Sequence, residues 1–317
     1  MIYSDELGQA RLNKTRLFVS FFMKNLSIII VNWNVIDLLT RLLDSIFQYT
    51  ERVEYEVIVV DNNSIDGSVN VLKIKYKDQI NAGLLKIINN DYNAGFAKAN
   101  NQGMRISQGE YLLFMNPDME LIDSNYLKLI DFMKASPNVG ICACRLTFGD
   151  HTIQANIKAD PDLGSQILIM LKLHHFLSWL PCLKKYLQKD FDYSQNKYVE
   201  QAMGAFIFTK KEIMEKLGGW DESYPLWWED VELCKKMRGS GYEIVYVPSV
   251  EAIHYGGQSF VQAPTFQKQK RFNKGMLIYF KKHHAKFAYF ILYILQPVNL
   301  FLTLLVKIFN VKPRMQQ

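Results

Sequence analysis

Four apolar runs in the first 121 residues, each followed by asparagine or aspartate, constrain the fold of this chain most strongly. The runs cover 26–34, 55–64, 84–90 and 111–115, and segments with helical spacing separate them. They lack polar–apolar alternation, which is typical of strands buried on both faces of a parallel sheet. We therefore expect an α/β domain with a mostly parallel central sheet and helices on both faces.

The polar residues that follow these strands are expected to lie at one edge of the sheet. In doubly wound sheets the ligand binds beyond the carboxyl ends of the strands. Neither GxGxxG nor GxxxxGK[ST] follows the first strand, which disfavours a dinucleotide-binding fold and a P-loop. The four polar ends are Asn32-Trp33-Asn34, Asp61-Asn62-Asn63, Asn89-Asn90-Asp91 and Asn116-Pro117-Asp118.

The second half of the chain predicts further strands and helices around the same sheet. We expect a strand over 205–209, a helix over 211–217, a helix over 230–238 and a strand over 243–247. A loop carrying His254 is expected after the last strand. Residues 93–107 are interpreted as a glycine loop that enters a helix.

Charge is distributed unevenly along the 317 residues, whose net charge is +6. Residues 252–317 contain ten Lys or Arg and no acid, whereas residues 1–251 carry a net charge of −4. The basic tail predicts an anionic surface as partner. It includes an apolar segment, 287–309, for which we expect a membrane-associated helix pair or re-entrant segment, with a true span or a buried helical hairpin as alternatives.

Three further features concern organisation and compartment. Residues 163–189 contain four lysines, two histidines and no acid, and are interpreted either as a membrane face or as an insertion packed on the core. The N-terminus shows no signal-peptide pattern, and residues 1–22 are expected to be an extension upstream of Met23. The four cysteines form no CxxC pair, so we expect reduced thiols in a cytosolic protein instead of a zinc site or disulfides.

Six segments together carry a resemblance to a known family. They are "SIIIVNWN", "EVIVVDNNSIDGS", "NAGFAKANNQGM", "LLFMNPDMEL", "GGWDESYPLWWEDVELCKKMRGSGY" and "HYGGQS". In their residues and their order along the chain, these segments resemble the motifs of family 2 glycosyltransferases of the GT-A fold. The "NPD" form and the overall size are similar to those of bacterial rhamnosyltransferases. The resemblance implies an extension over 1–25, a nucleotide-sugar half over 26–150, an acceptor half over 151–260 with the insertion 163–189, and basic, apolar membrane-associating helices over 261–317.

The resemblance implies a donor site at the strand ends. At the position of Asp61, the family has an acid that accepts a hydrogen bond from a uracil or thymine N–H. Taken alone, Asp61 is better explained as a helix cap. Gly95 would allow close approach of the backbone to the donor. The other implied donor-binding residues are Asn32, Asn34, Asn63, Phe96, Asn100 and Asn116.

The resemblance also implies a divalent metal, Mg²⁺ or Mn²⁺. These cations prefer oxygen ligands, and Asp118 is the expected carboxylate ligand. The family pattern is an acid, any residue, then an acid, so Asn116 stands in place of the first acid and weaker metal dependence is expected. His254 matches a position that often completes the metal shell. Read alone, 116–118 is also a good turn sequence, and His254 a packed histidine.

The implied catalytic pair is Glu229-Asp230 at the start of a helix. Asp230 matches the general base, and Glu229 is the alternative base or orients the acceptor; acids there also complement the helix dipole. Trp227 and Trp228 are expected to form a sugar-binding wall by stacking. On the acceptor side we expect Trp220, Asp221 and Gly204.

The implied reaction is direct, inverting transfer of a sugar from a nucleotide donor. The preferred hypothesis is L-rhamnose from dTDP-rhamnose, passed to a glycan or polyprenyl-diphosphate-linked acceptor at the cytoplasmic side of the inner membrane in cell-surface glycan synthesis. UDP-hexose and UDP-N-acetylhexosamine donors are alternatives, and nucleic acid is not an expected partner. A sugar nucleotidyltransferase needs a glycine- and lysine-rich loop after the first strand, which "NWNVIDLLT" lacks. Asp118, Asp230 and His254 argue against a non-catalytic carbohydrate-binding protein.

Overall fold

The computed structural model describes residues 25–51, 53–256 and 265–308. The predicted extension over 1–22 and the predicted domain boundary at 260 lie outside them. The first part of the chain forms β1 (Leu26–Asn32), α2 (Ile36–Tyr49), β2 (Tyr55–Asp61), α3 (Ser68–Lys75), α4 (Lys77–Asn81), β3 (Leu85–Asn89), α5 (Phe96–Ile106), β4 (Tyr111–Met115), β5 (Met119–Leu121), η1 (Asn125–Leu127), α6 (Lys128–Ala135) and β6 (Val139–Thr147).

The second part adds short strands, four α-helices, one 3₁₀ helix and a long final strand before the C-terminal helices. These elements are β7 (Ile153–Gln154), β8 (Ile157–Lys158), α7 (Leu163–Met170), η2 (Leu173–His175), α8 (Pro181–Leu187), β9 (Lys197–Tyr198), β10 (Gln201–Ala202), β11 (Phe206–Lys210), α9 (Lys211–Lys216), α10 (Glu229–Gly239), β12 (Glu243–His254), α12 (Thr265–His283) and α13 (Lys286–Ile308).

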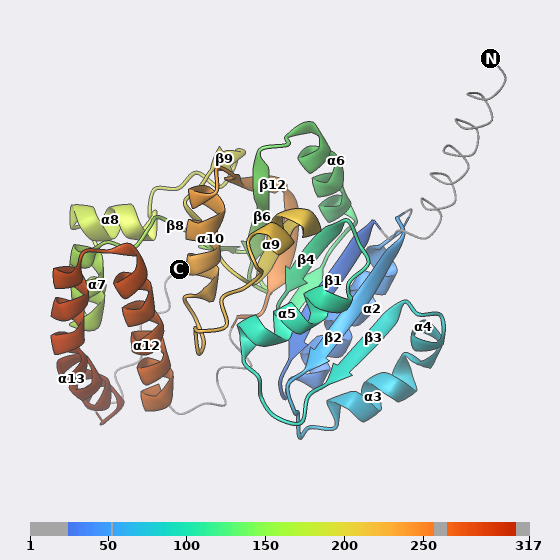
Figure 1. Cartoon of the computed structure of the whole chain (residues 1–317), viewed down its shortest axis with the longest axis horizontal. Helices are drawn as coiled ribbons and strands as arrows, with labels where there is room; N and C mark the ends of the chain where they lie inside the picture. Colours follow the sequence, from blue (N-terminus) through green and yellow to red (C-terminus); the bar gives the residue numbers. More distant parts are fainter. Residues whose placement is uncertain (1–24, 52, 257–264, 309–317) are drawn as a thin grey trace, which may run out of the picture.

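The central sheet has the order β3-β2-β1-β4-β11-β6-β12-β5, with β7 beside β6 and β9 beside β12 (Figure 1). β3, β2, β1 and β4 are parallel neighbours, as the unalternated apolar runs predict. β11 is antiparallel to both β4 and β6, while β6 and β12 are parallel. The expected α/β architecture is confirmed, and the antiparallel β11 joins its two halves.

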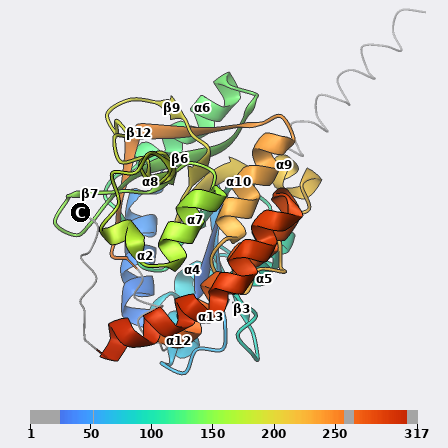
Figure 2. The same ribbon diagram turned by 90° about the vertical axis from the view of Figure 1, so that its left-hand side faces the viewer.

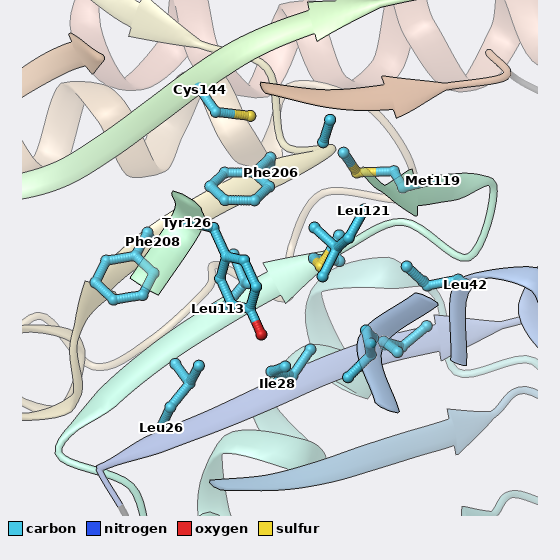
Figure 3. Close-up of a cluster of buried hydrophobic side chains, with 14 of the residues drawn as sticks. Leu26, Ile28, Leu42, Leu113, Met119, Leu121, Tyr126, Cys144, Phe206 and Phe208 are labelled. Atoms are coloured by element: carbon cyan, nitrogen blue, oxygen red, sulfur yellow. The ribbon is translucent and has the colours of Figure 1, made fainter. Parts of the chain in front are cut away.

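Buried side chains form one core on each face of the sheet. Along β1, Ile28 and Ile30 point to the face covered by α2 and α6, whereas Ile29 and Val31 point to the face covered by α5, α9 and α10. Figure 3 shows part of the first core, in which Leu42 of α2 and Tyr126 of η1 lie over strand residues. Because both faces are covered, the strands carry apolar residues at successive positions.

A third buried cluster joins α7, α12 and α13 beside the sheet, at the left in Figure 1. It includes Met170, Met276, Tyr279, Phe280 and Leu292. The segment expected as a helix pair or re-entrant segment is instead one helix, α13, which continues through Pro297. By length and composition, α13 is the one described helix that is able to cross a membrane, over Lys286–Val306.

The last strand is longer than the sequence predicts. The expectation that it ends at Val247 and that His254 lies in a loop was wrong, because β12 resumes its pairing with β6 after a register shift between Val247 and Glu251. Its final residues, Ala252 to His254, pair with β5. This pairing places His254 directly opposite Met119, next to Asp118 in the sequence.

Candidate functional site

Two cavities meet at the carboxyl ends of β1, β2 and β4. The larger has a volume of about 390 Å³, and its lining includes Gly204, Glu229 and Asp230. The smaller has a volume of about 90 Å³, and its lining includes Trp33, Asn62, Gly95, Asp118 and Arg271. Phe96 and Asn116 line both cavities. The strand ends and the start of the predicted catalytic helix therefore face two adjoining cavities.

The Asn116-Pro117-Asp118 segment is held by strands from the second half of the chain. The backbone N–H of Asn116 donates to the carbonyl of Ala205 at 3.0 Å, where β4 pairs with β11. The backbone N–H of Tyr255 donates to the carbonyl of Asp118 at 2.8 Å, where β5 pairs with β12. The turn after β4 is thus fixed by β11 and β12, which follow it by about 90 residues or more in the sequence.

Asp118 and His254 form a buried pair with the features of a metal site. Nε2 of His254 lies 3.4 Å from Oδ1 of Asp118, and both residues are at most 5% exposed. Nδ1 of His254 lies 2.7 Å from Oε1 of Gln154, whereas Nε2 is buried without a hydrogen-bond partner among the described residues. A carbonyl held at Nδ1 leaves the lone pair on Nε2, which is the arrangement of a metal-binding histidine.

These residues fit a divalent cation with open coordination positions. A carboxylate and an imidazole provide two ligands, and no group of three His, Cys, Asp or Glu residues able to hold a metal occurs in the described parts of the chain. Such a site leaves positions for oxygens of a diphosphate and for water. Asn116 lies beside the pair and adds no charge.

Glu229 and Asp230 begin α10 at the wall of the larger cavity. Oδ2 of Asp230 accepts a hydrogen bond from the backbone N–H of Gly204 at 3.0 Å, and Oδ1 accepts one from Val231 at 2.8 Å. Glu229 is 6% exposed, and its Oε2 has no hydrogen-bond partner among the described residues. The structure therefore brings together both acids that the sequence predicts.

The pKa is raised for both carboxyl groups, but the causes differ. Burial, and then the charge of Asp230, raise the pKa of Glu229 to about 8. Burial also raises the pKa of Asp230, but the N–H groups of Gly204 and Val231 oppose that shift. These two N–H groups therefore favour Asp230 over Glu229 as the ionised member of the pair.

Gly204 contacts Asp230 closely. A Cβ at position 204 would lie 3.1 Å from Cβ of Asp230 and 3.4 Å from its Oδ2. Close approach of a sugar was the role expected for Gly204 from the sequence. In the structure, the same missing side chain lets its backbone reach the Asp230 carboxylate, and the residue also lines the larger cavity.

The two tryptophans before the catalytic pair pack against α12. Trp228 is 3% exposed, with ring centroids 5.4 Å from Phe272 and 5.5 Å from Tyr279. Both tryptophans line the larger cavity together with Phe272, and Trp227 is the more exposed of the two. A sugar-stacking role for the pair stays a prediction. Both tryptophans have positive φ, a rare conformation for bulky residues that surrounding packing must hold.

Trp220 and Asp221 line neither cavity. Trp220 is 2% exposed and packs edge-on against Phe96 and Phe114 in the second core, so it is a packing residue. Asp221 pairs with Lys282 of α12. The expectation that these two residues build the acceptor side is therefore not supported by their positions.

Several expected donor residues hold the loops beneath the smaller cavity. Asp61 is fully buried and accepts hydrogen bonds from Nδ2 of Asn32 at 2.7 Å and from the backbone N–H of Ser64 at 2.8 Å. Asn34 accepts from the N–H of Ile65, Asn100 donates to the carbonyl of Phe96, and Asn63 is exposed. None of these five residues lines either cavity.

The cavity linings include polar and basic residues that were not predicted, among them Asn62, Arg271 and Lys158. Asn62, whose Oδ1 accepts from Asn90 and from the N–H of Ala94, lines the smaller cavity next to Gly95. Arg271 of α12 lines the same cavity as Asp118, and Lys158 of β8 lines the larger one. Asn62 was visible as one of the polar strand ends, but the basic residues reach the site only through long-range packing.

Residues 27–209 match the family model described as Glycosyl transferase family 2. This chain belongs to that glycosyltransferase family. Among curated proteins, it is 26% identical to rhamnosyltransferase WbbL of Escherichia coli (strain K12), over 72% of this chain and 82% of that protein. It is 25% identical to N-acetylglucosaminyl-diphospho-decaprenol L-rhamnosyltransferase of Mycobacterium tuberculosis, over 71% of this chain and 74% of that protein.

Other relatives of this glycosyltransferase are much longer. It is 27% identical to O-antigen biosynthesis protein RfbC of Myxococcus xanthus over 70% of the chain, but spans only 16% of that protein. It likewise spans only 26% of the uncharacterized protein y4gI of Sinorhizobium fredii.

Two solved structures confirm the GT-A fold. The mannosyltransferase PcManGT from Pyrobaculum calidifontis, in complex with GDP-Man and Mn²⁺, aligns with a TM-score of 0.56 at 17% identity, over 93% of this chain and 77% of that one. GalNAc-T7 with UDP, GalNAc and Mn²⁺ aligns with a TM-score of 0.55 at 19% identity, over 73% of this chain and 43% of that one.

Proposed function

We propose that this chain transfers L-rhamnose from dTDP-rhamnose, with inversion, to a lipid-linked glycan in bacterial cell-surface glycan synthesis. One observation carries the proposal: the Asp118–His254 pair and Asp230 line two cavities that meet at Asn116. A site for a leaving diphosphate and a base for an acceptor hydroxyl thus adjoin each other. The two rhamnosyltransferases among the relatives support this choice of sugar.

The smaller cavity is the proposed donor side. Trp33, Asn62 and Gly95 would contact the nucleoside, with the Asp61 turn beneath them. Asp118 and His254 would hold Mg²⁺ or Mn²⁺, which supplies positive charge against the departing diphosphate. The exposed Arg271 adds a second positive charge at the same cavity.

The larger cavity is the proposed acceptor side. Asp230 takes the proton from the acceptor hydroxyl while that oxygen attacks the anomeric carbon of the donor. The bond from that carbon to the diphosphate oxygen breaks on the opposite side, so the configuration inverts. The N–H groups of Gly204 and Val231 favour the ionised form of this carboxylate, and the raised pKa of Glu229 favours a neutral neighbour, which limits like-charge repulsion.

The proposed acceptor is a glycan linked to a polyprenyl diphosphate. The printed name of the mycobacterial relative describes such an acceptor, and Lys158 offers a positive charge at the larger cavity. An acceptor of this kind places the enzyme at the cytoplasmic side of the inner membrane as a peripheral protein. UDP-linked hexose or N-acetylhexosamine remains the alternative donor class.

A donor comparison tests the proposal. The purified chain, with Mn²⁺ and an N-acetylglucosaminyl-diphospho-lipid analogue, is incubated with dTDP-rhamnose, UDP-glucose or UDP-N-acetylglucosamine. We expect acceptor-dependent release of dTDP and a product heavier by one rhamnose. Turnover with a UDP-sugar alone would replace the proposed donor, and release of no nucleotide from any donor would contradict transfer.

A further inference from the structure

Large apolar side chains form one exposed stripe along α13. Their spacing of three or four residues places them on a single helix face. Phe287 is 64% exposed and Ile308 is 73% exposed, so the stripe extends over the whole helix. We name it the α13 stripe; it consists of Phe287, Phe290, Ile294, Val298, Phe301, Leu304 and Ile308. Contiguous apolar surface of this kind marks an interaction site.

The opposite face of α13 is fixed to the protein by buried polar contacts. Nδ2 of Asn273 in α12 donates to Oδ1 of Asn299 at 2.9 Å, and Nδ2 of Asn299 donates to the carbonyl of Met170 in α7 at 2.6 Å. Ala288 and Leu292 are buried on the same side. Rotation of α13 would bury these amides without partners, so the outward direction of the stripe is specified.

The neighbouring insertion adds exposed aromatic side chains. Phe176 and Trp179, which follow η2, are 78% and 70% exposed. They belong to the α7–α8 segment, and α7 shares the third buried cluster with α13 through Met170. Figure 2 shows α7 beside α13 on the side that faces the viewer. Phe and Trp beside lysines are typical of helices that lie at a membrane interface.

Charge identifies the partner of this surface. Residues 252–317 carry ten basic residues and no acid, and Lys281 and Lys286 are exposed where α12 meets α13. We propose that the α13 stripe lies in the plane of an anionic phospholipid bilayer, with Phe176 and Trp179 immersed beside it. A symmetric contact between two copies would bring these like charges together, which disfavours a dimer.

An in-plane arrangement also fits better than a span. α13 is about 35 Å long, enough to cross the hydrocarbon core. However, α12 is bound along it, and Lys270, Arg271 and Lys274 of α12 are exposed. A crossing α13 would draw these charges into hydrocarbon, which is costly. The in-plane arrangement immerses only the apolar face.

The surface has a direct consequence for the site. Phe272 of α12 lines the larger cavity, while Met276 and Tyr279 of the same helix share a buried cluster with α13. The immersed helix is thus one helix away from the proposed acceptor cavity. In this respect the inference rests on the lipid-linked acceptor proposed above, whereas the lipid contact itself is measurable without any sugar transfer.

Vesicle flotation tests the proposed contact. The full chain is mixed with phosphatidylcholine vesicles that contain either 30% or no phosphatidylglycerol, a mole fraction chosen to be on the order of that of an anionic leaflet. We expect flotation with the anionic vesicles only. The variant Phe290→Gln/Ile294→Gln/Phe301→Gln should reduce the vesicle-bound fraction on the order of a hundredfold, because three large side chains no longer enter lipid.

A matched control and a second readout make the outcome decisive. Ile65→Gln/Ile74→Gln removes two isoleucines that are 89% and 81% exposed elsewhere, and should float like the wild type. Undiminished flotation of the triple variant would overturn the proposal. A second result would also overturn it: the wild type sediments as a dimer, the triple variant sediments as a monomer, and both float equally well. Transfer to a short water-soluble acceptor should persist in the triple variant. A wild type that floats but transfers no sugar refutes the proposed function alone.

Thiol labelling tests the in-plane orientation. In a Cys182→Ser background, Lys286→Cys and Val306→Cys place one thiol near either end of α13 at exposed positions outside the α13 stripe, and the other three cysteines are buried. A membrane-impermeant maleimide added outside preformed vesicles should label both positions. Labelling of only one end would show a spanning helix and overturn the in-plane arrangement.

Discussion

The backbone N–H of Gly204 donates a 3.0 Å hydrogen bond to Oδ2 of Asp230, across 26 residues of sequence. This contact joins the segment before β11, which pairs with β4 in the central sheet, to the helix that carries the proposed base. The position of the Asp230 carboxylate is therefore set by the central sheet as well as by α10.

Replacement of Asp230 by Asn should abolish the proposed proton transfer and leave the donor cavity intact. We expect turnover to fall by roughly 10²–10⁴-fold, the usual contribution of a general base. Donor binding, followed by calorimetry with dTDP-rhamnose and Mn²⁺, should remain close to wild type. Asp221→Asn is the matched control, because Asp221 pairs with Lys282 away from the cavities. Equal turnover of Asp230→Asn and wild type would refute the base assignment.

Gly204→Ala should impair catalysis by displacing the Asp230 carboxylate. The added Cβ would lie 3.1 Å from Cβ of Asp230, so one of the two must move. We expect kcat to fall by about tenfold or more with little change in the KM for donor, since small misplacements of reacting groups are costly. Gly239→Ala, where a Cβ meets nothing within 4 Å, is the control within α10. Equal kcat for both variants would indicate that the contact does not position the base.

The metal site predicts a graded loss of Mn²⁺ affinity. His254→Ala removes a proposed ligand, and Gln154→Ala removes only the carbonyl that orients its ring. We expect Mn²⁺ binding to weaken on the order of a hundredfold for the first variant and about tenfold for the second. Electron paramagnetic resonance of free Mn²⁺ measures this without turnover. Unaltered binding by His254→Ala would exclude the histidine as a ligand.

The raised pKa of Glu229 predicts a pH-dependent gain in stability for Glu229→Gln. Between the ordinary value of 4.5 and about 8, the folded state keeps a proton that the unfolded state has lost. Raising the pH through this window therefore lowers the free energy of unfolding of the wild type, by up to about 1.4 kcal/mol per pH unit. Urea unfolding at pH 5 and pH 8 should show the stability of Glu229→Gln, relative to wild type, rising with pH. Glu212→Gln, which replaces an exposed glutamate, is the control. If the stabilities of Glu229→Gln and the wild type change in parallel with pH, the raised pKa of Glu229 is contradicted.

The sequence predicted the parts of the site that depend on local pattern. Strand ends are local, and buried apolar runs are bounded by polar residues, so Asn116, Asp118 and the start of α10 could be located in advance. Asp61 was correctly placed at a strand end. Its contacts to Asn32 and Ser64, however, depend on how two strands align, which the pattern does not encode.

The errors concern tertiary packing. Trp220 is an aromatic residue in a motif-rich segment, and its burial follows from contacts with Phe96 and Phe114, which are distant in sequence. The last strand was expected to end at Val247, yet β12 continues to His254 through a register shift between Val247 and Glu251. Arg271 lies in the basic tail, for which the sequence predicted an anionic surface as partner. Only the docking of α12 brings this residue to the smaller cavity.

The central claim, inverting transfer with Asp230 as the base, is tested most directly by the anomeric configuration of the product. Nuclear magnetic resonance of the glycan made from dTDP-rhamnose by the wild-type chain should show the configuration opposite to that of the donor, and Asp230→Asn should form no detectable product. A product that retains the donor configuration, or the same product formed at the same rate by Asp230→Asn, would contradict the mechanism.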